Sequence, residues 1–155
     1  MEYSVEVINL SKSYGKKDAV RGIDFKIKEN EIIGLLGPNG CGKTTTIGML
    51  LGLLKPSKGQ ININGMKIEK NRIEILQKIN FISPYIELPK KLTVKQNLLV
   101  YGKLYSVKNL NNRIEYLTNK LRLEELLNKI TGELSSGQKN RVSLAKALIN
   151  NPTVL

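Results

Sequence analysis

The chain carries the run Gly37-Pro38-Asn39-Gly40-Cys41-Gly42-Lys43-Thr44, which matches the phosphate-binding pattern G-x-x-x-x-G-K-[ST]. A row of phosphates needs many hydrogen-bond donors close to it, and glycines let the backbone approach and turn through positive φ. In this pattern the lysine reaches the β- and γ-phosphates, and the hydroxyl after it binds Mg²⁺. The run therefore predicts a nucleoside triphosphate site, with Lys43 on the phosphates and Thr44 on the metal ion.

The residues on either side of this loop favour the same interpretation. Residues 31–36 have the pattern of a short buried strand, and residues 44–54 that of a helix. The amides and the dipole at a helix N-terminus attract an anion. The helix has apolar residues at i, i+3, i+4 and i+7, which predicts a core-facing side made of Ile47, Leu50, Leu51 and Leu54.

Length and composition indicate one globular domain in a reducing compartment. The chain has 155 residues, 41% of them hydrophobic, and its one cysteine allows no internal disulfide. It has no signal peptide pattern and no apolar stretch near the roughly 20 residues of a membrane span. The formal charge of +12 is spread along the chain with no basic run between aromatic residues, so we expect a solvated surface and no nucleic acid partner.

Further strands are predicted over residues 5–10, 22–28, 60–65 and 79–83. Asn30 suits a tight turn after the second of these, because asparagine tolerates the left-handed conformation. Asn64-Gly65 predicts a turn that ends the third.

Residues 93–127 have a helical pattern. Thr93 and Gln96 have the spacing of a capping box, and a polar link over residues 106–112 divides the segment into two helices. Each helix has one apolar face, which we interpret as a packing surface: Leu98, Tyr101, Leu104 and Tyr105 on the first, and Leu110, Ile114, Leu117 and Leu121 on the second.

A second motif, Leu134-Ser135-Ser136-Gly137-Gln138, precedes a predicted helix over residues 138–149. Hydroxyl residues and a glycine at a helix start suit a second anion site. Taken alone, the run is more typical of an ordinary N-cap than of an anion site. What distinguishes it is its place, about one hundred residues after the phosphate-binding loop and beyond a helical insertion.

That order of motifs resembles the nucleotide-binding domains of ABC (ATP-binding cassette) proteins. The second motif resembles the family's signature sequence Leu-Ser-Gly-Gly-Gln, and Tyr14 matches the aromatic residue that stacks on adenine. Residues 59–65 resemble the family's hairpin, and residues 151–155 resemble the approach to its Walker B strand. The resemblance covers nearly the whole chain, from Tyr3 to Leu155.

The resemblance implies an α/β fold. It has the P-loop NTPase core of the ABC type, an N-terminal antiparallel β region and a helical subdomain, with the C-terminal part of the core missing. Residues 1–155 then form a single incomplete ATP-binding domain, with a nucleotide-binding core over 1–83 that contains the loop. A helical subdomain and partner-docking loop follow over 84–133, and the signature motif, its helix and the start of the Walker B strand over 134–155.

The function implied is that of an ATP-binding and hydrolysing subunit that powers a transporter, most similar to exporters. ATP and Mg²⁺ would be held by Tyr14, Gly37, Pro38, Asn39, Gly40, Cys41, Gly42, Lys43, Thr44 and Thr45. Leu134, Ser135, Ser136, Gly137 and Gln138 would act in trans, from a second subunit paired head to tail. A membrane subunit would dock between Pro84 and Lys91, which places the protein in the cytoplasm on the inner face of the cell membrane.

The chain departs from the family pattern at three points. Ser136 replaces the first glycine of the usual pair, and Pro84 stands where the family has a glutamine that contacts Mg²⁺ and water. The Mg²⁺-binding aspartate, the catalytic glutamate and the switch histidine of the family are expected beyond Leu155, and the sequence has no histidine. We therefore expect these 155 residues to be a fragment without ATPase activity.

Two alternatives for the function and two interpretations of Cys41 stay open at this point. The protein is also compatible with a soluble ABC ATPase that acts on ribosomes or DNA, or with a non-hydrolysing cassette. Cys41, inside the loop, is either a small space-filling residue or a thiol made reactive by the helix N-terminus.

Overall fold

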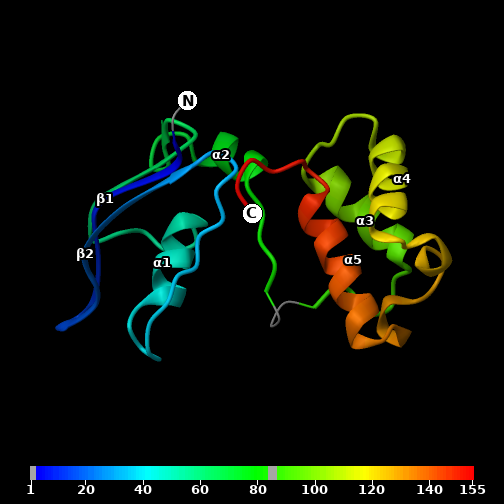
Figure 1. Ribbon diagram of the computed structural model, residues 1–155, viewed down its shortest axis with the longest axis horizontal. Helices are drawn as coiled ribbons and strands as arrows, with labels where there is room; N and C mark the ends of the chain where they lie inside the picture. The colour runs from blue at the N-terminus through cyan, green and yellow to red at the C-terminus, as the bar shows by residue number, and fades with distance from the viewer. Residues whose placement is uncertain (1–2, 84–86) are drawn as a thin grey trace. The chain divides into compact units, whose positions relative to one another are not determined.

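A computed structural model describes residues 3–83 and 87–155 of the chain. These residues form two compact units, made chiefly of residues up to 76 and of residues 77–153, and each unit is described by itself. The first contains β1 (Tyr3–Tyr14), β2 (Lys17–Lys28), α1 (Lys43–Leu50), β3 (Lys58–Ile63) and β4 (Met66–Lys67), and α2 (Arg72–Lys78) follows (Figure 1). The second contains α3 (Val94–Leu104), α4 (Leu110–Leu121) and α5 (Ser136–Leu148), with 3₁₀ turns at Glu124–Leu126 and Thr131–Glu133.

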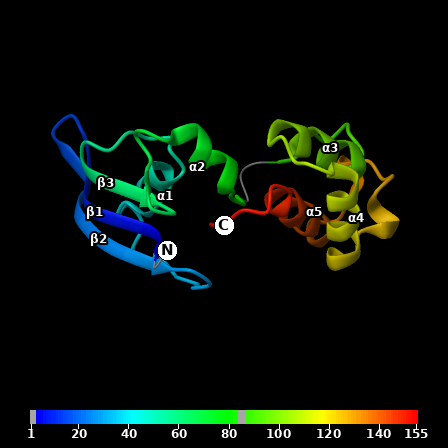
Figure 2. The ribbon, with the colours of Figure 1, turned by 90° about the horizontal axis from the view of Figure 1, so that it is seen from above.

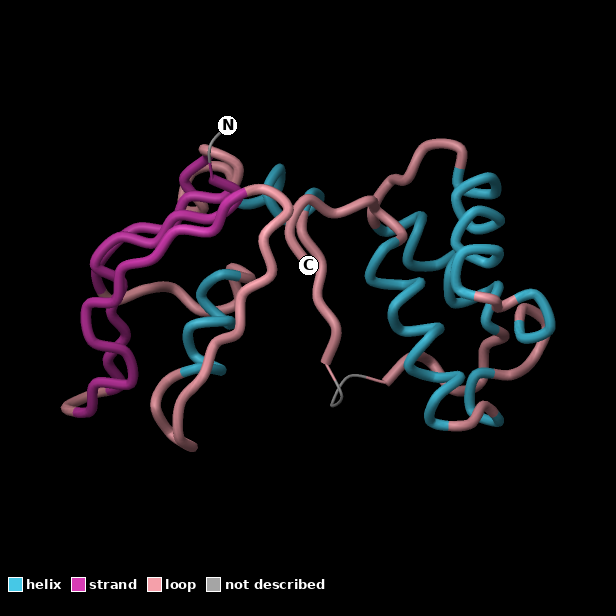
Figure 3. The backbone as a smooth tube through the Cα atoms, in the orientation of Figure 1, coloured by secondary structure: helices cyan, strands magenta, loops and turns pink. Residues whose placement is uncertain are grey.

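The first unit is built on an antiparallel sheet with the strand order β2-β1-β3-β4. Figure 3 shows its strands in magenta. Val5 lies opposite Ile63 and Val7 opposite Ile61, and all four side chains are at most 2% exposed. Directly opposed residues in an antiparallel pair share a face of the sheet, so these four define its buried face. The predicted N-terminal antiparallel region is confirmed, and its first two strands are longer than expected.

Two predicted turns are confirmed by the backbone. Asn30 adopts a φ of 60°, and the Lys28 amide just before it donates to Glu31 Oε2 at 2.8 Å. Asn64 and Gly65 have φ values of 50° and 74°, as the two central residues of a type I′ hairpin turn require. In both turns, residues that tolerate a positive φ reverse the direction of the chain, as the sequence predicts.

Helix α1 lies against one face of the sheet (Figures 1 and 2). It ends at Leu50, earlier than the predicted end at residue 54, because Gly52 turns left-handed with a φ of 64° and terminates it. Its buried residues are Thr46 and Met49, whereas Ile47 is 46% exposed. The predicted stripe was wrong: the side of α1 that packs inward carries Thr46 and Met49, and Ile47 lies one residue around the helix from Thr46, facing outward.

The strand expected over residues 31–36 is absent from the structure, which has an extended loop there (Figure 3). Ile32 is 99% exposed and Leu36 is 91% exposed, so the prediction that this segment is buried was wrong. A strand must pair its N–H and C=O groups with neighbours, and no strand among the described residues lies beside this one. The predicted strand over 79–83 does not form either: Ile79 alone makes a bridge, and the Thr153 amide donates to the Lys78 carbonyl at 2.8 Å beside it.

The second unit is helical, and α3 and α4 confirm the two predicted helices. Thr93 caps α3 as expected: its Oγ1 accepts from the Gln96 amide at 3.2 Å, and its own amide donates to Gln96 Oε1 at 2.9 Å. The core contains Leu98, Ile114 and Leu117. Leu104 is 72% exposed instead, because six residues after Leu98 the helix has turned away from the core face.

Helix α5 begins at Ser136, two residues before the predicted start at 138, because Ser135 is its N-cap. At its other end Arg113 of α4 closes the helix, donating to the carbonyl oxygens of Leu148 at 2.5 Å and Ile149 at 3.3 Å. In the described part of the chain, no helix has the length and apolar character needed to cross a bilayer.

Candidate nucleotide-binding site

The phosphate-binding loop is an exposed turn that leads into α1. Gly40 and Gly42 adopt φ values of 82° and 95°, and the Cys41 amide donates to the Pro38 carbonyl at 3.3 Å. A side chain at Gly42 would overlap the carbonyl oxygen of Ala19 on β2 and crowd Val20. Position 42 therefore requires glycine for two reasons: the positive φ of its backbone and the close packing of the loop on the sheet.

The start of α1 offers free backbone donors. Gly42 is the N-cap and no side chain caps the helix, so its first amides have no side-chain acceptor. Lys43 Nζ bends back over the loop and donates to the carbonyl oxygens of Gly37 at 2.6 Å and Pro38 at 2.9 Å. The sequence thus folds into a small cradle of N–H groups with one ammonium at its mouth, which fits an anion such as phosphate.

A cavity of about 470 Å³ adjoins this cradle. Its lining includes three residues that the motif predicts, Gly40, Cys41 and Lys43. It also includes residues that the motif does not predict, from β2, the loop before the motif and α1: Asp18, Ala19, Val20, Arg21, Ile23, Leu35, Leu36 and Thr46. The lining residues of β2 lie some twenty residues before the loop in the sequence. Their contribution to the cavity becomes visible only in the structure, where α1 packs on the sheet.

Tyr14, the residue predicted to stack on a base, ends β1 and is 51% exposed. It lies opposite Lys17, one residue from the cavity-lining Asp18. The Lys12 ammonium stands 5.2 Å from the centre of the Tyr14 ring. Sequence reasoning missed Lys12, although a spacing of two residues in a predicted strand is a signal that could have indicated a shared face with Tyr14.

Thr44 and Thr45 lie in the first turn of α1, where Thr44 is exposed. The resemblance gives the Thr44 hydroxyl to Mg²⁺, and oxygen ligands of this kind suit that ion when substrate phosphates supply the others. No cluster of three or more acidic, cysteine or histidine residues suited to a metal occurs in residues 3–83 and 87–155.

The second motif caps α5. Ser135 Oγ accepts from the Gln138 amide at 3.3 Å, and the Ser135 amide donates to Gln138 Oε1 at 2.9 Å, which makes a capping box. Leu134 is 4% exposed and anchors the motif, whereas Ser135, Ser136 and Gly137 are exposed. A side chain added at Gly137 would meet nothing within 4 Å. The motif therefore presents an open helix start to the outside of its unit.

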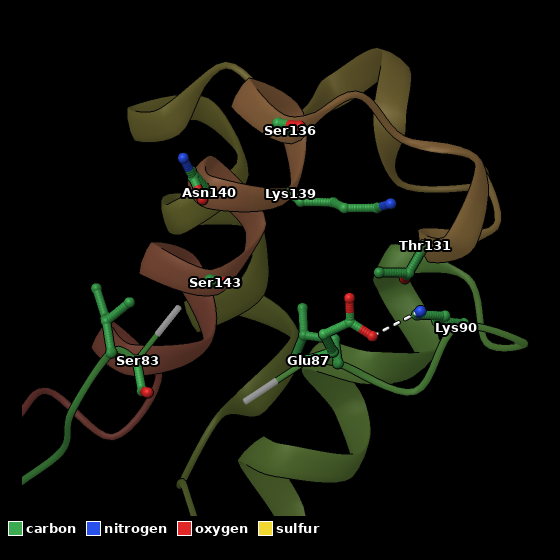
Figure 4. A pocket seen from close by; sticks show the side chains of 10 residues that line it. Ser83, Glu87, Lys90, Thr131, Ser136, Lys139, Asn140 and Ser143 are labelled. Atoms are coloured by element: carbon green, nitrogen blue, oxygen red, sulfur yellow. Dashed lines mark ion pairs between the residues drawn. The ribbon is translucent and has the colours of Figure 1, made fainter. Parts of the chain in front are cut away.

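A pocket of about 330 Å³ opens beside α5 in the same unit (Figure 4). Its polar rim includes Lys139 and Ser143 of α5 and the ion pair of Glu87 with Lys90, whose atoms lie 2.6 Å apart. The hydrogen bond from Lys90 and the charge of that lysine lower the pKa of the Glu87 carboxyl, with help from the Lys139 charge. Pro84, which stands at the family's glutamine position, lies outside the described residues.

A glycine-rich loop that opens a helix, with a lysine over it and a cavity at its side, defines a P-loop nucleotide-binding protein. The family model described as ABC transporter matches residues 20–155, which include both motifs. The chain belongs to the ABC transporter family of ATP-binding proteins.

Curated relatives support this assignment. The chain is 39% identical over 155 residues to Nod factor export ATP-binding protein I of Rhizobium johnstonii, covering 98% of this chain and 50% of that protein. It is 38% identical over 158 residues to the bacitracin transport ATP-binding protein BcrA of Bacillus licheniformis, covering 100% of this chain and 50% of that protein. The chain thus spans about half the length of the curated relatives it matches.

Solved structures share the fold. The cbiO1 protein of Clostridium perfringens, part of the ABC transporter complex cbiONQ, matches with a TM-score of 0.84 and 30% identity over 98% of this chain and 63% of that one. MJ0796, a bacterial ABC transporter cassette with a dimeric structure, matches with a TM-score of 0.80 and 28% identity over 96% and 70%. The α/β P-loop fold of the ABC type is thereby confirmed.

Proposed function

We propose that this chain is the ATP-binding part of a subunit that powers an exporter by binding and hydrolysing ATP. The observation that carries the proposal is the cradle at the start of α1, with free amides and the Lys43 ammonium over it. The named relatives act in export of Nod factors and in bacitracin transport, which supports a role in export. The protein would work in the cytoplasm, on the inner face of the cell membrane.

ATP bound in the cradle would be held by this chain's own groups. The loop amides and Lys43 hold the phosphates, Thr44 orients the ion that accompanies them, and Tyr14 receives the base. Bound Mg²⁺ would supply charge neutralisation at the transferred phosphate.

The signature motif would complete the site from a second copy. Its exposed Ser135 and the open space at Gly137 suit a surface that meets a phosphate from outside its own unit. A related cassette has a dimeric structure, which supports such a pairing. ATP would then join two copies head to tail, and its loss would separate them.

A membrane subunit would dock beside α5. The segment between Pro84 and Lys91, where docking is predicted, includes Glu87, Leu88 and Lys90, and these line the pocket shown in Figure 4. That pocket combines apolar Ile82 and Leu88 with charged groups, which suits a short helix of a partner with an apolar and a polar side. The similar protein cbiO1 is part of an ABC transporter complex, which supports this role.

Sedimentation velocity with and without MgATP tests the pairing. We expect ATP to shift the chain from monomer to dimer, and Gly137→Glu to abolish the shift while ATP binding persists, because a carboxylate would then face the γ-phosphate. Asn112→Glu makes the same charge change at an exposed position of α4 and should dimerise normally. A chain that binds ATP and stays monomeric, or a Gly137→Glu variant that still dimerises, would contradict the proposal.

The net charge of +12 favours a second candidate, a soluble ABC ATPase that acts on ribosomes or DNA. Sedimentation of the protein with ribosomes, lost after RNase treatment, would support this candidate. Recovery of the full protein with a membrane subunit in detergent extracts would support transport instead. A third possibility, a cassette that binds ATP but never hydrolyses it, predicts no phosphate release from the whole protein.

A further inference from the structure

Lys12 is joined to two parts of the candidate nucleotide site. Its ammonium lies 5.2 Å from the centre of the Tyr14 ring and donates a 2.8 Å hydrogen bond to the carbonyl oxygen of Lys55. Lys55 belongs to the segment that follows α1, the helix at whose start the phosphate cradle lies. One side chain therefore joins the base platform to the segment that leaves the C-terminal end of α1.

The sheet register puts Lys12 on the face that looks toward the loop. Lys12 lies opposite Val20 in the β1–β2 ladder, and opposed residues project from the same face. Val20 is buried and comes against Gly42 of the loop, so this face is the one that backs the cradle. Tyr14 comes two residues later, past a register shift between Lys12 and Ser13, and the contact of the Lys12 ammonium with its ring brings the two side chains together.

Two more hydrogen bonds fix this end of β1 to the segment after α1. The Ser57 amide donates to the Ser11 carbonyl at 2.9 Å, and the Ser13 amide donates to Ser57 Oγ at 3.1 Å. Lys12 adds the only one of these three links that also touches the Tyr14 ring. The backbone of the strand is held without it, so the particular effect of Lys12 falls on the aromatic side chain.

We propose that Lys12 is a positioning residue for the purine base of ATP, acting through Tyr14. The ammonium occupies one face of the ring, holds the ring in place by a cation–π contact and leaves the other face to stack on the base. The hydrogen bond to the carbonyl oxygen of Lys55 keeps the ammonium in that position. This inference rests on the proposed ATP site and concerns its base-binding end.

Titration calorimetry of the chain with ATP and with inorganic tripolyphosphate tests this role. Lys12→Met should weaken ATP binding by about two- to fivefold, the size expected of one cation–π contact, and should leave tripolyphosphate binding unchanged. Lys12→Arg should restore ATP binding, since a guanidinium also stacks on an aromatic ring. Lys26→Met is the matched control, because Lys26 stands 4.8 Å from the Tyr3 ring in the same sheet. This control should bind ATP normally.

Tyr14→Ala separates failure of this inference from failure of the site itself. If Tyr14→Ala weakens ATP but not tripolyphosphate, and Lys12→Met added to it causes no further loss, the two residues act as a unit. If Tyr14→Ala weakens ATP while Lys12→Met does not, or if Lys12→Met binds ATP more tightly, the role of Lys12 is overturned and the site stands. If Tyr14→Ala has no effect, both the platform and its positioning by Lys12 are overturned. If neither ligand binds, the proposed function itself fails.

Discussion

At the scale of single residues, the loop works because glycine stands where the backbone needs it. Gly42 has a φ of 95° and no room for a side chain beside Ala19, so the close contact between loop and sheet depends on it. Lys43 meanwhile rests on two neutral carbonyl oxygens. Phosphate oxygens accept stronger hydrogen bonds from an ammonium than carbonyl oxygens do, so a bound nucleotide would displace these contacts.

Cys41 reports on occupancy of the loop. It is exposed, it is the chain's one cysteine, and it lines the cavity at the cradle. A maleimide should therefore label the chain once, and MgATP should slow labelling by covering the thiol. Mass spectrometry gives the rate, and Lys43→Ala is the control in which protection should be lost. Equal labelling rates with and without nucleotide in the unaltered chain would remove this prediction.

At the scale of elements, α5 is linked to its neighbours by a half-buried lysine, Lys146. The Lys146 ammonium lies 5.2 Å from the Phe81 ring centre and 5.1 Å from that of Tyr101, which joins α5 to α3 and to the segment after α2. Burial lowers the pKa of Lys146 from its usual 10.5. The unfolded chain therefore binds this proton more tightly than the folded one, and stability must rise with pH in the range that ends near 10.5.

Comparison with Lys146→Met isolates this effect, since methionine keeps the apolar stem and has no charge to bury. As pH approaches 10.5 from neutrality, the free energy of unfolding should rise in the unaltered chain relative to the variant. The raised pKa of Tyr105, caused by its burial, acts in the opposite direction in both proteins and cancels in the difference. Urea unfolding at a series of pH values measures the difference, and two parallel curves would show that burial of Lys146 has no such cost.

At the scale of the whole molecule, local chemistry was predictable and pairing across the chain was not. The capping box at Thr93 and the hairpin turn at Asn64 are short-range patterns and were found as predicted, and α5 begins two residues before its predicted start. Residues 31–36 were predicted as a strand from their apolar pattern, but a strand also needs partners, and none of the described strands pairs with them.

The same distinction applies to the site. The motif predicted Lys43 and the glycines, because a P-loop is local in sequence. It could not predict Ala19, Val20 or Lys12, which reach the site through the register of β1 on β2 and the packing of α1 on the sheet. The roles of the signature motif and of the docking segment stay predictions, since each requires a partner molecule.

Titration calorimetry of MgATP into the unaltered chain and into Lys43→Ala tests the central claim most directly, because the account assigns the triphosphate to this one cradle. We predict saturable binding of one ATP per chain and a loss of at least about tenfold in affinity in Lys43→Ala, the size expected when a charge-assisted contact to phosphate is removed. Circular dichroism should show that the variant keeps its helices and strands. Equal affinity of the two proteins for ATP, or no binding by a folded chain, would contradict the account.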